Sequence, residues 1–190
     1  MLRIHFSTED LVRVRVLAEP HPMWELLLSL HLVQTDQGEP VFGTWRRRLR
    51  TTHVPAATLL KTLARPRGYS PDFLTSQADV RDLDTGLESL LSTPRTRLRA
   101  DMSKLADQVA LPTWAADVAE GEPAMLRQVT DALRSFHTAA LGPYWPSIRH
   151  HVRADRTRRA EAAMAGGFEA VLSTLHPTVR LQAPVLDGSG

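Results

Sequence analysis

The chain contains no cysteine among its 190 residues. Disulfide bridges, thiolate metal sites and cysteine nucleophiles are therefore all excluded. Lysine is nearly as rare, because Lys61 and Lys104 are the only two, so almost all of the basic charge is arginine. Arginine binds phosphate and carboxylate groups bidentately. The simpler explanation of this composition is codon bias in a GC-rich genome, which also raises alanine and proline.

Long hydrophobic runs are also missing, since no stretch of about 18 consecutive apolar residues occurs, the length that indicates a membrane-spanning helix. The N-terminus, Met1–His5, leads directly into polar residues without the pattern of a signal peptide. We therefore expect a cytoplasmic protein with no membrane partner. Hydrophobic residues make up 43% of the chain and the formal net charge is only +2. This composition suffices for a real core, and the length suits one domain.

Motifs of catalysis and metal binding are missing as well. The sequence has no Gly-x-Ser-x-Gly, no phosphate-binding loop and no Gly-x-Gly-x-x-Gly. Its eight histidines include no His-x-x-x-His pair. His150 and His151 are adjacent, so they point in different directions on a helix. We therefore expect that the protein is not an enzyme and has neither a metal site nor a cofactor.

What is present favours a mainly α fold, a multi-helix domain with a small β element near the N- and C-termini. Pro22–Val33 is apolar on most of its helical circumference, which predicts a buried helix around which the rest of the chain packs. Pro123–Leu141 is the most regular segment, with a seam of apolar residues spaced three and four apart. That seam consists of Leu126, Val129, Leu133, Phe136 and Ala140.

The remaining pattern completes one helical domain over residues 1–186, followed by a flexible tail at 187–190. Leu2–Phe6 alternates and is predicted to pair with strands at 178–181 and 184–186. Alternating Val and Arg favour another strand over Leu11–Leu17. Arg65–Leu74 is punctuated by proline and glycine, which predicts a long loop that Tyr69 and Phe73 pin to the core. Helices are expected at 41–49, 56–64, 82–91, 95–109, 112–119, 144–164 and 168–175, with Gly166-Gly167 as a stop.

Two kinds of candidate site follow from this arrangement. Helical domains bind ligands between helices, in apolar cavities with a few polar groups. The candidate pocket residues are Trp24, His31, His137, Tyr144 and Trp145, although each of them alone is more typical of a core. Arginine clusters on helix faces can contact phosphates or a partner subunit, or can be solvated faces with local ion pairs. The clusters are Arg46–Arg50 and the set Arg149, Arg153 and Arg156, neither attached to a helix-turn-helix pattern.

Four segments together carry a family resemblance. They are Pro22–Leu32, Arg67–Leu74, Leu141–Ile148 and Gly166–Glu169 with Leu175–Pro177. In this order and spacing they resemble the N-terminal region of actinobacterial ArsR-like winged-helix transcriptional regulators, a domain of unknown function that precedes the DNA-binding domain. The resemblance extends from Leu2 to about Leu186.

The resemblance implies a regulatory domain that dimerises or senses a small-molecule effector. In such regulators the winged helix follows this region, and the chain stops at Gly190, so we expect the DNA-binding domain to be absent here. DNA would then be contacted only through a downstream winged helix, by a homodimer. The cysteines of metal-responsive members of the wider group are missing, so we expect no metal sensing.

Two alternatives stay open. A stand-alone helical protein-interaction module would use the Leu126–Ala140 seam and would need that seam exposed. Direct DNA binding would use Arg149, Arg153 and Arg156. Ligand sensing instead predicts an enclosed pocket lined by Trp24, Tyr144 or Trp145.

Overall fold

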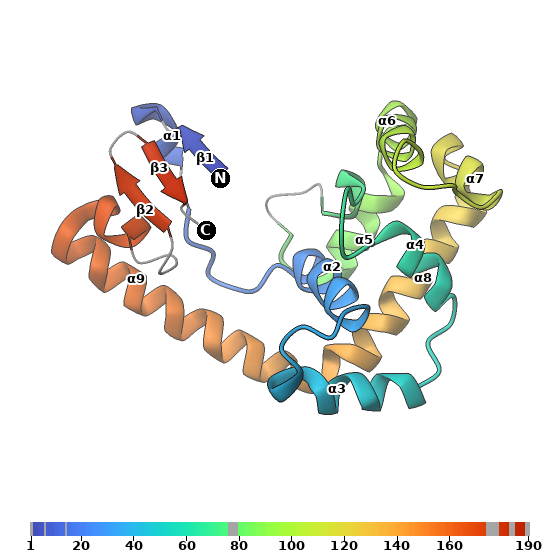
Figure 1. The fold of residues 1–190 in the computed structure, drawn as a ribbon, viewed down its shortest axis with the longest axis horizontal. Helices are drawn as coiled ribbons and strands as arrows, with labels where there is room; N and C mark the ends of the chain where they lie inside the picture. Colours follow the sequence, from blue (N-terminus) through green and yellow to red (C-terminus); the bar gives the residue numbers. More distant parts are fainter. Residues whose placement is uncertain are drawn as a thin grey trace. The chain divides into compact units, whose positions relative to one another are not determined.

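The computed structural model describes residues 2–5, 7–13, 15–75, 80–173, 179–182 and 185–188. These residues are mainly helical, as the sequence predicted (Figure 1). The chain divides into two compact units rather than the single domain expected over 1–186. We call Met1–Pro20 with Ser147–Gly190 the terminal unit, and His21–Pro146 the central unit. The division arises because the helices of the central unit share one core, whereas the two chain ends pair with each other.

The terminal unit holds a three-stranded antiparallel sheet in the order β1-β3-β2. Leu186 of the middle strand lies opposite Ile4 on one side and Leu181 on the other. Residues 187–188, which the sequence assigned to a tail, belong to the middle strand. The elements of this unit are β1 (Leu2–His5), α1 (Thr8–Arg13), most of α9 (Trp145–Ser173), β2 (Val179–Gln182) and β3 (Val185–Gly188).

Helix α1 replaces the first part of the strand predicted over Leu11–Leu17. The amide and hydroxyl of Ser7 donate to Asp10 Oδ2 at 2.8 and 2.7 Å, and the amide of Asp10 donates to Ser7 Oγ at 3.1 Å. This reciprocal capping box satisfies amides that the helix start would otherwise leave unpaired. The cap therefore outweighs the β propensity of the valines that follow, and the strand prediction was wrong for residues 11–13.

Helix α9 is interrupted at Gly166 and Gly167, where the sequence predicted a stop. Gly166 has φ −144° and ψ 18°, and Gly167 has φ 68° and ψ −169°. The second of these conformations is open almost only to glycine, since a Cβ would clash with the backbone. The two glycines therefore separate the long first part of α9 from its last turns.

The central unit is built on α8, which contacts α2, α3, α4, α5 and α7. The sequence analysis predicted this central role for α2, which contacts α5 and α8. With 18 residues against 12, α8 is long enough to meet more neighbours. The elements are α2 (Pro22–Val33), α3 (Glu39–Thr51), α4 (Ala57–Leu63), η1 (Asp72–Leu74), α5 (Leu83–Leu91), α6 (Arg95–Ala106), α7 (Trp114–Glu120), α8 (Pro123–Ala140) and η2 (Gly142–Tyr144).

The seam predicted on α8 lies inside the unit. Leu126, Val129 and Leu133 are 4%, 0% and 2% exposed, and Phe136 and Ala140 are buried as well. A stand-alone interaction module needed this seam on the surface. The seam is therefore core, and that alternative loses the surface on which it depended.

Helix α2 is buried on one side only. Met23, Leu26 and Leu30 are buried, but Trp24 and Leu28, one turn apart, are 47% and 54% exposed. The expectation that protein surrounds the whole helix was therefore wrong for this stripe.

The long loop at 65–74 is fixed to α6 by a buried carboxylate, Asp101. Its two oxygens accept from the Tyr69 hydroxyl and from the Phe73 amide, both at 2.8 Å. Phe73 is fully buried, which confirms that these two aromatic residues pin the loop. Burial, together with the bond to Asp101, raises the pKa of Tyr69. The loop therefore depends on a carboxylate that the sequence pattern did not single out.

Leu133 and Leu28 offer a matched test of the core. Leu133→Ala should lower the free energy of unfolding by about 2–5 kcal/mol, because it leaves a cavity under α8. Leu28→Ala removes the same atoms from an exposed position and should change it by less than about 0.5 kcal/mol. Urea denaturation followed by circular dichroism measures both. Equal losses in the two variants would contradict a core centred on α8.

Candidate ligand pocket

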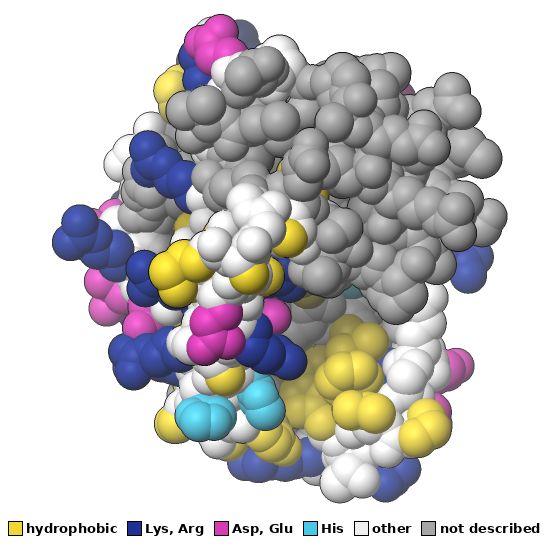
Figure 2. All heavy atoms as spheres, turned by 90° about the vertical axis from the view of Figure 1, so that its left-hand side faces the viewer, with side chains coloured by type: hydrophobic (Ala, Val, Ile, Leu, Met, Phe, Trp, Pro, Cys, Tyr) yellow, Lys and Arg dark blue, Asp and Glu magenta, His cyan; other side chains and the backbone are white. Residues whose placement is uncertain are grey.

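The basic patch predicted on α9 is partly neutralised within the terminal unit. Glu19 accepts from Arg149 Nε at 2.9 Å and from Arg153 Nε at 2.7 Å. These hydrogen bonds lower the pKa of Glu19. Arg156 is exposed and has no salt bridge to another described residue. Among the described residues on the face drawn in Figure 2, basic side chains are interspersed with acidic ones.

A pocket of about 560 Å³ lies in the same unit, between the first part of α9, its last turn and residues 15–17. Arg159 donates through Nε to Asp155, while its buried Nη1 has no partner among the described residues. Asp155 also pairs with Arg158. Asp155 therefore neutralises part of the positive charge that Arg15, Arg158 and Arg159 bring to the pocket lining.

The five residues predicted to line a ligand pocket do not come together as a group. Trp24 and Tyr144 are exposed, and His31 Nε2 lies 3.0 Å from Ser70 Oγ in the long loop. His137 and Trp145 do meet, with ring centroids 5.0 Å apart in an edge-to-face arrangement. Neither of the two pockets described here includes any of the five among its lining residues.

The central unit contains a different pocket, of about 580 Å³. This volume falls within the range of small-molecule sites, about 300–1,000 Å³. Its walls come from α2, α3, the α3–α4 turn, α4 and α8, so segments far apart in sequence form it. The lining residues are Leu30, Val33, Leu49, Arg50, Thr51, Thr52, His53, Val54, Ala57, Leu60, Lys61 and Phe136.

The floor and the rim of this pocket differ in chemistry. Buried side chains from four helices, Leu30, Leu49, Leu60 and Phe136, make the floor apolar. Exposed Arg50, His53 and Lys61 supply positive or polar groups at the rim. Such a combination of an apolar cavity and a few polar groups is typical of binding sites for small molecules.

The turn between α3 and α4 carries backbone strain beside the pocket. Ala56 has φ 54° and ψ 28°, the one non-glycine residue with positive φ in the described part of the chain. The left-handed conformation costs a residue with a Cβ roughly 1–2 kcal/mol. It places Val54 and Ala57, on either side, at the pocket wall. Strain of this kind is found preferentially at functional sites.

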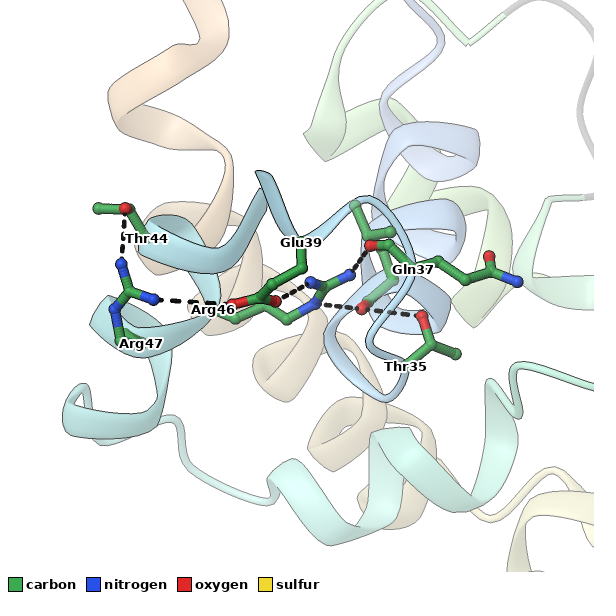
Figure 3. Close-up of polar contacts among 7 residues, drawn as sticks. Thr35, Gln37, Glu39, Thr44, Arg46 and Arg47 are labelled. Atoms are coloured by element: carbon green, nitrogen blue, oxygen red, sulfur yellow. Dashed lines mark hydrogen bonds and ion pairs between the residues drawn. The ribbon is translucent and has the colours of Figure 1, made fainter. Parts of the chain in front are cut away.

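A buried arginine fixes α3 against the end of α2 (Figure 3). Arg46 is 1% exposed. Its Nε donates to Leu32 O at 3.0 Å, its Nη1 to Glu39 Oε2 at 2.8 Å, and its Nη2 to Gln37 O. The prediction of a solvent-facing basic patch at Arg46–Arg50 was therefore wrong for Arg46. The signal for its burial was the spacing Glu39, Gly43, Arg46, which puts all three on one helical face.

Two further contacts stabilise the junction of α2, α3 and α4 around Arg46. Gly43 leaves room for the Glu39 carboxylate, since a Cβ there would come too close to Glu39 Oε1. Gln34 Nε2 donates to Leu30 O at 2.7 Å and to Ala64 O at 2.6 Å. The last turn of α2 is thus joined to α3 and to the end of α4, the helices that bear the pocket wall.

The described residues form neither a metal-binding cluster nor a membrane-spanning helix. Among the described residues, no group of three or more His, Asp or Glu is placed to hold a metal ion. Within that part of the chain, no helix has the length and apolar character needed to cross a bilayer.

The chain matches no protein family model, no curated protein and no solved structure. The likeness to ArsR-like regulators, and with it the regulatory function, therefore stays a prediction from the sequence.

Substitutions at Arg46 and Arg47 test whether the buried guanidinium holds α3 in place beside the pocket. Arg46→Ala should lower the free energy of unfolding by at least about 2 kcal/mol, because it removes a buried side chain together with its three hydrogen bonds, one of them to a carboxylate. Arg47→Ala, on the exposed side of α3, should cost less than about 0.5 kcal/mol. Chemical denaturation compares the two. A small effect at position 46 would mean that the buried guanidinium does not hold α3.

The lowered pKa of His137 in the folded protein predicts that stability depends on pH. Burial lowers its pKa below the ordinary 6.5. Below about pH 6.5 the unfolded chain therefore binds a proton that the folded protein binds less readily, so stability falls as pH decreases. His137→Phe keeps a ring beside Trp145 and should reduce the loss of unfolding free energy between about pH 7.5 and pH 5.5. His150→Phe, at an exposed position, should leave that loss unchanged, and equal slopes in all three proteins would refute the prediction.

Proposed function

We propose that the central unit is the small-molecule-sensing part of a transcriptional regulator of the ArsR-like type. The observation that carries this proposal is the pocket of about 580 Å³ with an apolar floor drawn from four helices. A ligand that covered this floor would remove apolar side chains from water and would stabilise the unit. The family resemblance supplies the regulatory context, with a homodimer that contacts DNA through a downstream winged helix.

The packing around the pocket supports a route from ligand to response. Phe136 in the floor precedes His137, which packs on Trp145, the first residue of α9. On the other wall, Trp45 of α3 donates through Nε1 to Ala140 O at 2.9 Å. A ligand that moves the floor would therefore shift the C-terminal end of α8. Such a shift biases an attached domain if the ligand prefers one of two arrangements.

Direct DNA binding through α9 has weaker support. Two of its three proposed contacts, Arg149 and Arg153, already pair with Glu19. Phosphate would have to displace that carboxylate before it gained either arginine.

The neutral fluorescent dye N-phenyl-1-naphthylamine tests whether the pocket binds small apolar molecules. Its emission should rise on binding to the wild-type protein, because the pocket floor excludes water. Ala57→Leu places extra side-chain volume in the pocket and should weaken binding at least about tenfold, which corresponds to about 1.4 kcal/mol. Ala116→Leu adds the same atoms to an exposed site on α7 and should have no effect.

Melting curves establish that both variants are folded. Equal binding of the dye to wild-type protein and to Ala57→Leu would refute a sensing function for this pocket, as would a wild-type protein that binds neither the dye nor an apolar amphiphile.

A further inference from the structure

We infer that the pocket of the central unit takes an anionic amphiphile, a small molecule with a carboxylate head and an apolar body. This inference rests on the proposed function and goes further, since it assigns the class of ligand. It follows from the charges at the rim, the way its hydroxyl groups are used and the chemistry of the floor.

The rim carries cations without matching carboxylates. Arg50 and Lys61 line the pocket, and none of the lining residues is Asp or Glu. Neither cation forms a salt bridge with any residue in the described ranges. Several other arginines of the central unit do have such partners. These are Arg46 and Arg47 with Glu39, Arg95 and Arg99 with Glu120, and Arg134 with Asp84.

The hydroxyl groups at the rim leave the donor role to the cations. Thr51 and Thr52 each donate to the carbonyl of Arg48, at 2.8 and 3.0 Å. Their hydroxyl hydrogens are thus already used within α3. A ligand head that needs donors would find them on Arg50 and Lys61, whose charged N–H groups prefer an anionic oxygen.

The floor of the pocket determines the chemistry of the ligand body that is attached to the charged head. Leu30, Leu49 and Leu60 offer only hydrocarbon to the ligand, and Phe136 adds an aromatic ring. A fully charged, compact anion such as phosphate would gain nothing from this surface and would lose hydration. A carboxylate on a hydrocarbon body fits both regions, because its chain removes apolar surface from water while its head stays at the exposed rim.

Decanoate, decanol and decylamine share a chain and differ in the charge of the head. Titration calorimetry with the full chain should give decanoate at least tenfold tighter binding than decanol, and decylamine the weakest. The Arg50→Gln/Lys61→Gln double variant should lose the preference for decanoate while decanol binds as before. Arg48→Gln, an exposed arginine of α3 outside the pocket lining, should behave as wild type.

The result separates the two proposals. If the neutral dye binds and decanoate shows no advantage over decanol, or keeps it in the double variant, the inference about the ligand is overturned and the sensing function stands. If neither the dye nor any of the three amphiphiles binds, both are overturned. A preference for decanoate that depends on Arg50 and Lys61 supports both.

Discussion

The Arg46 guanidinium is the interaction on which the pocket depends. Removing a full positive charge from water is costly unless its hydrogen bonds are replaced. Here two carbonyls and a carboxylate replace them, and these acceptors come from the end of α2, the following loop and the first turn of α3. The charge can therefore be buried only when these three segments meet in one arrangement. That arrangement sets the position of Leu49 and Arg50, one turn further along α3.

Helix α8 plays the complementary role through apolar contact. Its seam is buried against neighbours on several sides, and its last turns reach Phe136 in the pocket floor and His137 beside Trp145. Because α8 packs in the core along one face and lines the pocket near its C-terminal end, it couples the pocket to the core. Ligand binding and the stability of the central unit should therefore be linked, since any molecule that binds only the folded state stabilises it.

Periodicity predicted most of the helices, because it reports which residues of one segment share a face. The α8 seam was predicted in this way, whereas the stop at Gly166-Gly167 was predicted from the pair of glycines. The pocket could not be, because its lining comes from four helices whose order in space depends on Arg46, Gln34 and a strained Ala56. In sequence, Arg46 looked like one member of a basic run. Trp24 and Tyr144, which the sequence analysis assigned to a pocket, are exposed and line neither of the two pockets described above.

The floor and the rim of the pocket are stabilised by different kinds of contact, and this difference affects how the pocket would select a ligand. Its floor is tied by long-range contacts, through Arg46 and Gln34, to helices that the core fixes. Its rim is held by local bonds within α3, such as those of Thr51 and Thr52 to Arg48 O. A floor fixed by the core limits the size and shape of the apolar body. A rim of long, solvated Arg and Lys side chains can adjust to different acidic heads, so we expect selection to be stricter for the body than for the geometry of the head.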